Sequence, residues 1–156
     1  MKKLPLLLSI ALLSFLGCKD HAKNETTNEH ATHATHHDNN ALSNSWVKDI
    51  QLDNGTKWNA NPETNEGVTN MLRLLENNTP TTLEDYHHLA KALNTEKNYI
   101  VKECTMKGAS HDNLHVWLHP LIDKIGTLEA SKTPEEAQPI YKSIKENITA
   151  YHTYFK

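Results

Sequence analysis

Three histidines, one cysteine and one methionine lie within sixteen residues of this 156-residue chain. They are Cys104, Met106, His111, His115 and His119. A thiolate and a thioether are soft metal ligands, and imidazole suits copper, zinc, iron and nickel. The segment therefore predicts a site for a soft transition-metal ion, with copper(I) as the first choice and zinc(II) as the second.

The spacing of these residues predicts how they are presented. The three histidines recur every four residues, so on an α-helix their side chains share one face. Gly108 is a place where a preceding helix can stop, because glycine accepts the left-handed conformation. Ser110 can then cap the next helix. The segment is typical of the corner of a helical hairpin, in which Cys104 faces His111 or His115.

Two helices are expected before this corner. The first begins at Asn61-Pro62, a capping residue followed by a proline at the first helical position, and it ends before Pro80. The second begins at a capping box formed by Thr81 and Glu84.

Two more helices are expected after it. The third runs from Ser110 to about Ala130, and the fourth begins at a capping box of Thr133 and Glu136 with Pro134 between them. Apolar residues recur at spacings of three and four in both helices, which indicates that each buries one face. The stripes are Leu114, Leu118, Leu121, Ile125 and Leu128 in the third helix, and Ala137, Ile140, Ile144, Ile148, Tyr151 and Phe155 in the fourth.

A short β-hairpin is expected ahead of the helices, because an Asp-Asn-Gly turn signal at 53–55 lies between Trp46 and Trp58. Four amphipathic helices joined by short connections favour an up-and-down bundle. The predicted fold class is therefore all-α, a four-helix up-and-down bundle with a short N-terminal hairpin, over residues 45–156.

The N-terminus reads as an export signal over residues 1–17. Lys2 and Lys3 precede an apolar run from Leu4 to Leu16, which is too short for an ordinary transmembrane helix. The run ends in Phe-Leu-Gly-Cys18, which resembles the lipobox of bacterial lipoproteins. That resemblance implies cleavage before Cys18 and attachment of lipid, such as palmitate, to it. A secretory signal with a chance cysteine is the alternative, and both readings export the protein.

Residues 18–44 are expected to form a disordered, lipidated tether, because they are polar and contain hardly any large apolar residue. Short histidine-rich tracts bind divalent metals without fixed geometry, so the tether is a second candidate metal-binding region. Its candidate ligands are His30, His33, His36 and His37. A polar spacer that happens to use histidine is the plainer alternative.

Two further histidines, His87 and His152, border the apolar sides of the second and fourth helices and are candidate ligands across the bundle. The alternative for all bundle histidines is a core-edge position with a hydrogen bond to a neighbouring helix, and for Cys104 it is apolar packing.

No nucleophile elbow, glycine-rich phosphate loop or His-Glu-x-x-His motif is present, so no enzymatic activity is predicted. The net charge of −3 and the lack of a basic stripe argue against nucleic-acid binding.

The string Cys-Thr-Met-x-Gly-x-x-His-x-x-Leu-His-x-Trp-Leu-His-Pro, which starts at Cys104, resembles a group of small uncharacterised Bacteroidetes lipoproteins. An upstream Leu-Asp-Asn-Gly-x-Lys-Trp segment, which ends at Trp58, adds to the likeness. The resemblance covers about residues 50–156 and implies a shared architecture and site, but no reaction. Lys19 and Asp20, directly after the lipobox, resemble part of the surface-export signal of Bacteroidetes lipoproteins.

These features predict a lipoprotein of the bacterial cell envelope, anchored through Cys18 in the outer rather than the inner membrane and facing either the periplasm or the exterior. It would bind copper or zinc for buffering, handover or resistance. An envelope metal transporter or another envelope protein is the expected partner. The alternative is an envelope protein–protein interaction domain that binds no metal and whose histidines are structural.

Overall fold

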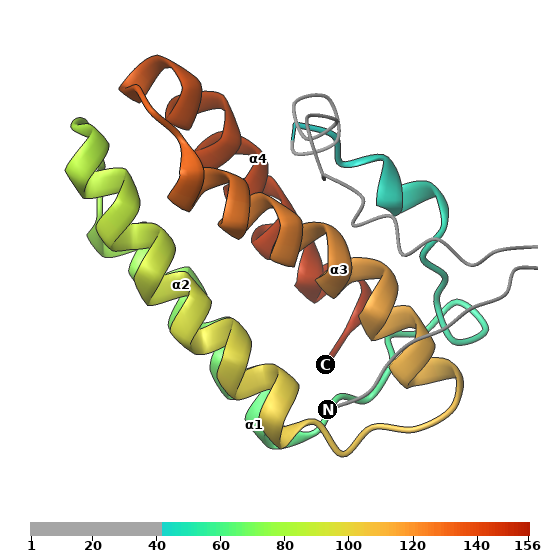
Figure 1. Cartoon of the computed structure of the whole chain (residues 1–156). Coiled ribbons are helices and arrows are strands. Elements are labelled where there is room, and N and C mark those ends of the chain that lie inside the picture. Colours follow the sequence, from blue (N-terminus) through green and yellow to red (C-terminus); the bar gives the residue numbers. More distant parts are fainter. Residues whose placement is uncertain (1–41) are drawn as a thin grey trace, which may run out of the picture. The chain divides into compact units, whose positions relative to one another are not determined.

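The computed structural model describes residues 42–156, which contain four α-helices and no strand. Each helix packs against the next one along the chain, and α1 also packs against α4 (Figure 1). This arrangement is a four-helix bundle, and the prediction of an all-α fold is confirmed. The helices are α1 (Pro62–Asn77), α2 (Leu83–Glu103), α3 (Ala109–Ala130) and α4 (Pro134–Tyr154), and the 3₁₀-helix η1 (Ser45–Lys48) precedes them.

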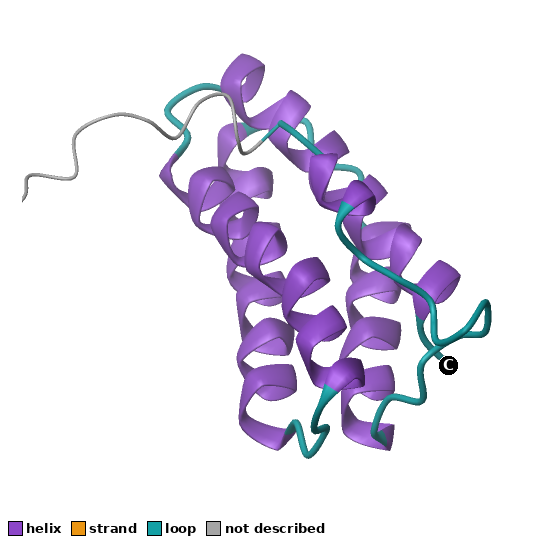
Figure 2. Cartoon of the chain, turned by 90° about the vertical axis from the view of Figure 1, so that its right-hand side faces the viewer, coloured by secondary structure: helices purple, strands orange, loops and turns teal. Residues whose placement is uncertain are grey.

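Residues 42–60, which we call the strap, lead into α1 and run along one edge of the bundle (Figure 2). The predicted signal peptide and all but the last three residues of the predicted tether lie outside the described residues. Among the helices of residues 42–156, none combines the length and the apolar character that crossing a membrane requires.

Two of the four predicted helix starts are confirmed residue for residue. The first helix has Asn61 as its N-cap and Pro62 as its first residue. The last has Thr133 as its N-cap, whose hydroxyl accepts a hydrogen bond of 3.3 Å from the backbone N–H of Glu136. In both, proline occupies a position whose missing N–H would have had no intrahelical partner.

The capping box of α2 lies one residue later than predicted. Thr82 accepts from the backbone N–H of Asp85, and the Asp85 carboxylate accepts from the backbone N–H of Thr82 at 2.9 Å. The same carboxylate also accepts from the N–H of Thr81 at 3.1 Å. These bonds to the ionised form lower the pKa of Asp85 to about 2. The prediction of Thr81 and Glu84 was wrong because the sequence allows two capping boxes, Thr81 with Glu84 and Thr82 with Asp85. The structure forms the second, whose acid has the shorter side chain.

The corner before α3 also differs from the prediction. The preceding helix ends at Glu103, and an extended loop follows before Gly108, which has a φ of +62° and acts as the N-cap of α3. Ser110 does not cap this helix, because its hydroxyl donates to the carbonyl of Lys107 at 3.1 Å. Glycine's positive φ therefore serves the start of α3 and not the end of α2.

The predicted β-hairpin is not confirmed, because residues 42–60 contain no strand, although its turn is present. Asp53 and Thr56 exchange two backbone hydrogen bonds of 2.9 Å around Asn54 and Gly55, both with positive φ, as in a two-residue hairpin turn. The pairing stops there. Trp58 instead pairs with the C-terminus, where its N–H donates to the carbonyl of Tyr154 at 2.8 Å. A two-stranded ribbon is marginal alone, and Trp58 gains a better partner elsewhere.

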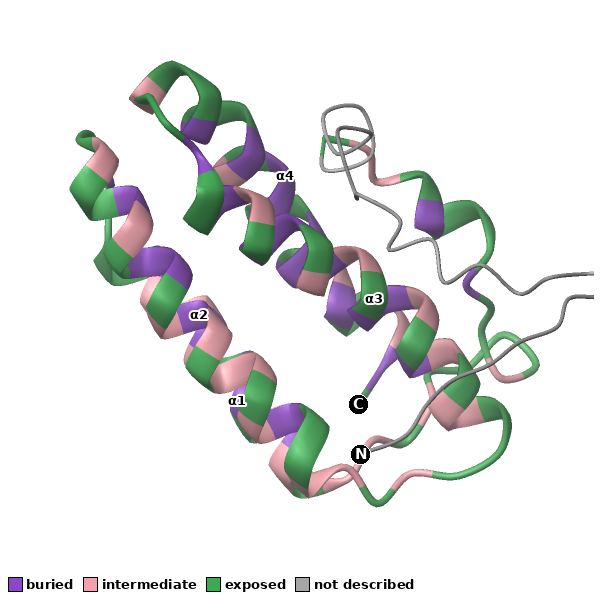
Figure 3. Cartoon of the chain, in the orientation of Figure 1, coloured by how far each residue is buried: buried purple, intermediate pink, exposed green. Residues whose placement is uncertain are grey.

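The predicted core stripes of α3 and α4 are confirmed, because every residue named for them is buried. Trp117 joins them, and it packs edge-on against Tyr151, whose ring stacks on Phe155 with centroids 4.8 Å apart. The buried faces of the helices point inward in Figure 3. In α2, Val101 is 55% exposed, although the preceding residue, Ile100, is fully buried.

Candidate functional site

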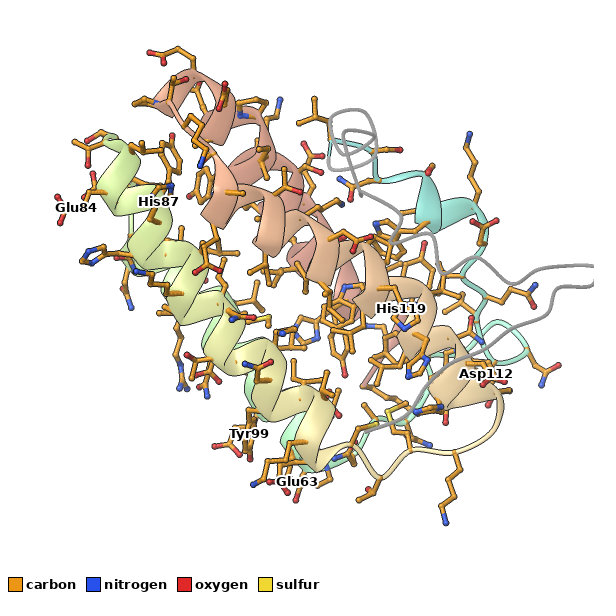
Figure 4. All side chains as sticks on the ribbon, viewed as in Figure 1. Glu63, Glu84, His87, Tyr99, Asp112 and His119 are labelled. Atoms are coloured by element: carbon orange, nitrogen blue, oxygen red, sulfur yellow. The ribbon has the colours of Figure 1, made fainter. Side chains whose placement is uncertain are left out.

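The three histidines of α3 form a continuous row along the helix. The ring centroids of His111 and His115 are 4.2 Å apart, and those of His115 and His119 are 4.8 Å apart. This is the contact expected of side chains four residues apart on one helix. Figure 4 shows His119 and Asp112 along the same helix. We call His111, His115 and His119 the histidine row.

The histidine row faces mostly towards solvent. His111 is half-buried, whereas His115 and His119 are exposed. Partial burial lowers the pKa of the His115 imidazole, and positive charge on His111 or His119 lowers it further, while Asp112 acts in the opposite direction. The middle imidazole therefore loses its proton readily, which leaves a nitrogen lone pair free to bind a metal.

Cys104 is the C-cap of α2, half-buried and packed against the core. Burial raises the pKa of the Tyr151 hydroxyl. The Cys104 sulfur lies close enough to Tyr151 that a negative charge on it raises this pKa further. The Tyr151 hydroxyl donates to Asn65 Oδ1 at 2.9 Å, which places this contact between α1 and α4. Met106 is half-buried against the same core from the loop before α3.

The predicted ligands do not converge on one point in the described part of the chain. Within residues 42–156, no three His, Cys, Asp or Glu side chains are placed to hold one metal ion together. The structure thus brings together the three imidazoles of the histidine row, and it shows Cys104 in contact with the bundle core. The tether candidates and Cys18 lie outside the described residues.

The other bundle histidines have separate surroundings. His87 Nε2 donates to the carbonyl of Ser131 at 3.0 Å, because a carbonyl can only accept, and this bond ties α2 to the α3–α4 connection. In Figure 4, His87 lies towards that end of the bundle, whereas His119 lies near the middle of α3, away from that end. His152 is exposed, with its ring edge-on to Tyr151. Neither one extends the histidine row, and their role as ligands across the bundle stays a prediction.

Sequence reasoning missed a buried polar cluster centred on Lys124, which is 0% exposed. Its ammonium donates to Asn44 Oδ1 of the strap and to Asn147 Oδ1 of α4, the latter at 2.8 Å. Burial lowers the pKa of Lys124 to about 8, and the charge of Glu146 opposes that shift. We call Lys124, Asn44 and Asn147 the lysine cluster.

Asn44 is the residue that closes the lysine cluster. Its side-chain N–H groups donate to Glu146 Oε2 at 3.0 Å and to the carbonyl of Ser143 at 3.4 Å, and its Oδ1 also accepts from Trp46 Nε1 at 3.0 Å. Asn44, the last residue of the predicted tether, is therefore bound into the bundle. The sequence did contain a signal for the burial of Lys124. This residue lies three positions after Leu121 and four before Leu128, both in the predicted core stripe.

Comparison with known proteins adds no assignment: no family model, no curated protein and no solved structure matches this chain.

Proposed function

We propose that this protein binds a transition-metal ion, copper before zinc, at the histidine row of α3. The observation that carries the proposal is the contact of three imidazoles in sequence, with ring centroids 4.2 and 4.8 Å apart on one exposed helix face. Two imidazoles four residues apart can bind the same ion, and imidazole suits both copper and zinc. Divalent copper binds nitrogen sites more tightly than zinc does, which sets the order of preference.

The exposure of the row supports binding and handover in preference to a structural role. Structural zinc sites use four protein ligands and are closed, whereas sites with open positions exchange ligands. His115 and His119 are exposed, so a partner can reach the bound ion. The helix already holds the imidazoles together, and little conformational entropy is lost when the ion binds.

The soft donors extend this proposal to copper(I). Cys104 and Met106 lie on the segment that leads into α3, and both are half-buried. A thiolate and a thioether suit copper(I) better than zinc(II). For either one to join His111, the loop between α2 and α3 has to rearrange. We therefore propose that divalent ions use the histidine row alone, and that copper(I) recruits the cysteine as well.

The setting that we propose is the bacterial envelope, with the chain anchored by lipid at Cys18. The lipobox-like sequence before Cys18 supports this location. The histidines of the tether would then add weaker binding capacity between the membrane and the bundle. An envelope protein that accepts or donates the metal is the proposed partner.

The test is a competition titration with a chelating probe on a chain without residues 19–41, so that the tether histidines do not compete. His115 belongs to both adjacent pairs, whereas His111 and His119 lie about 12 Å apart along the helix axis and cannot share an ion. His115→Ala should therefore weaken copper(II) and zinc binding by roughly 100-fold, the loss expected when a second contact is removed. His111→Ala and His119→Ala each leave one pair intact and should cost much less.

His88→Ala is the matched control, because His88 is also an exposed helical histidine, with Glu84 as its neighbour at 3.5 Å. It should leave the affinity unchanged. If His115→Ala binds metal as tightly as His88→Ala does, the histidine row is not the site. Cys104→Ala should weaken copper(I) binding under reducing conditions and leave zinc binding unchanged. An equal loss for both ions would contradict separate ligand sets.

A second candidate function is an envelope interaction domain that binds no metal. The hydrogen bond from His87 to the Ser131 carbonyl favours it, because this histidine serves packing and not ligation. The two functions separate in one measurement. Added copper or zinc should raise the melting temperature of the metal-binding protein, and it should leave that of a purely structural bundle unchanged.

A further inference from the structure

An apolar groove of about 660 Å³ lies between the second half of α3 and the first half of α4. Ile122 and Gly126 line it from α3, and Pro139 and Ile140 line it from α4. Leu42 of the strap lies at its edge and is 47% exposed. The volume is within the range of sites that bind small molecules, roughly 300–1,000 Å³.

Gly126 has no role in the packing of the bundle. A Cβ atom at this position would meet nothing within 4 Å, so no neighbouring helix requires a glycine here. By contrast, a Cβ atom at Gly67 would come within 2.5 Å of Ile100, and that glycine is needed for the contact between α1 and α2. A glycine inside a helix costs about 1 kcal/mol relative to alanine. At Gly126 no packing contact offsets this cost, and the missing side chain leaves the groove wider.

Pro139 lines the groove from α4, and like Gly126 it disfavours the helix in which it lies. It lies inside α4, where it removes one backbone hydrogen bond and costs about 3 kcal/mol relative to a good helix former. Two helix-disfavouring residues therefore line the same groove. Departures from local preference that have no packing reason concentrate at functional sites.

The charges of the groove are of one sign. Asp123 and Glu136 are among its lining residues, and within residues 42–156 no lysine, arginine or histidine lines it. Glu136 accepts a hydrogen bond of 2.8 Å from the backbone N–H of Lys132, but this bond does not neutralise the carboxylate. An anionic ligand would meet two negative charges, whereas a cationic one would be attracted by both.

We propose that this groove binds a small amphiphilic cation, with its apolar part against Gly126 and Ile140 and its positive charge at Asp123 and Glu136. The apolar lining supplies most of the affinity, and the two carboxylates select the head group. Apart from Leu42, the groove is lined by residues between 122 and 140, after the histidine row of α3, so the proposal does not depend on metal binding.

The experiment uses the chain from residue 19 onward, which keeps the whole bundle and strap and needs no detergent. Isothermal titration measures the binding of dodecyltrimethylammonium, dodecyl maltoside and dodecyl sulfate, each below its micelle concentration. Backbone NMR shifts of Thr127 and Ile140 locate the bound probe. The ammonium probe should bind at least tenfold more tightly than the sulfate, with the neutral probe between them.

Variants connect this selectivity to the groove. Gly126→Leu fills the groove and should weaken all three probes at least tenfold, and Gly126→Ala should do so by less while remaining folded. Asp123→Asn should lower the preference for the ammonium over the neutral probe about fivefold, the value for one charge at about 4 Å in water. Glu129→Gln is the matched control, because Glu129 is an exposed acid of α3 outside the groove, and it should change binding less than twofold.

Three results would overturn the proposal. Equal affinity for the ammonium and sulfate probes would remove the selection by charge. Unchanged binding by a folded Gly126→Leu or Gly126→Ala variant would place the probe elsewhere. A complete lack of binding by all three probes would show that the groove is not a small-molecule site.

Discussion

Replacing Asn44 with alanine tests whether the strap closes over the buried charge of Lys124. In the native protein the Asn44 side chain accepts a hydrogen bond from that ammonium and another from Trp46 Nε1. Asn44→Ala removes the Oδ1 atom that accepts both bonds and leaves the ammonium with Asn147 as its protein partner. A buried charge that loses a partner is costly, so we expect the free energy of unfolding to fall by about 2–4 kcal/mol.

Replacing Lys124 itself should cost far less. The drop in its pKa from 10.5 to about 8 corresponds to roughly 3 kcal/mol of unfavourable burial at neutral pH. Lys124→Met removes this penalty and keeps the volume of the side chain, but it leaves Asn147 Oδ1 without its donor, which costs about 1–3 kcal/mol. The loss of the penalty equals or exceeds this cost. The variant should therefore be as stable as the wild type, or up to about 2 kcal/mol more stable, at pH 7.

The pH dependence has a definite sign. Because the folded pKa of Lys124 lies below its unfolded value, the unfolded chain binds more protons between about pH 8 and 10.5. The unfavourable contribution is complete below pH 8 and disappears as the pH rises through this window. The difference in stability between wild type and Lys124→Met should accordingly shift in favour of the wild type between pH 7 and 10.

Urea denaturation followed by tryptophan fluorescence measures each free energy, with Asn59→Ala as a control for an exposed asparagine of the strap. That control should change stability by less than about 0.5 kcal/mol. In the Lys124→Met background, Asn44→Ala should cost only about 1–2 kcal/mol, because the bonds to Trp46, Glu146 and Ser143 are lost but no buried ammonium loses a partner. An equal cost of Asn44→Ala in both backgrounds would show that this residue does not stabilise the ammonium.

Three other predictions use paired variants or a fractionation. Thr82→Ala should cost about 1 kcal/mol in urea denaturation and Thr81→Ala much less, because only the first removes the N-cap; the reverse order would restore the sequence-based register. Gly67→Ala should destabilise the bundle by about 1–3 kcal/mol through overpacking, whereas Gly126→Ala should stabilise it by about 0.4–1 kcal/mol, and melting temperatures that move in the same direction would contradict the two environments. Cys18→Ser should release the protein from the membrane fraction or stall its processing, and normal processing with wild-type fractionation would exclude the lipid anchor.

The helices were predictable because their signals are local. Asn61-Pro62 and Thr133-Pro134 each combine a cap and a proline within two residues, and both starts are confirmed. The apolar stripes were equally clear, since burial on one face produces a spacing of three and four. The hairpin failed for a non-local reason. The turn around Gly55 formed as predicted, but the strand partner of Trp58 comes from the far end of the chain.

The candidate site was predictable in part for the same reason. The spacing of His111, His115 and His119 is a property of one helix, so their contact follows from the sequence. The position of Cys104 depends on the length of the loop after α2, which no residue pattern specified. The lysine cluster joins three separate elements, and its main sequence signal was one charged residue within an apolar spacing.

The contacts of Asn44 also set the order in which the bundle can be completed. Its partners in α4 lie 99 and 102 residues further along the chain. At the usual rates of synthesis, the last of them emerges about 5–20 s after Asn44 does. Contacts this distant close late, because the entropy of a long loop must be lost first. Chains that already contain α3 but still lack α4 therefore carry Lys124 without its full cover.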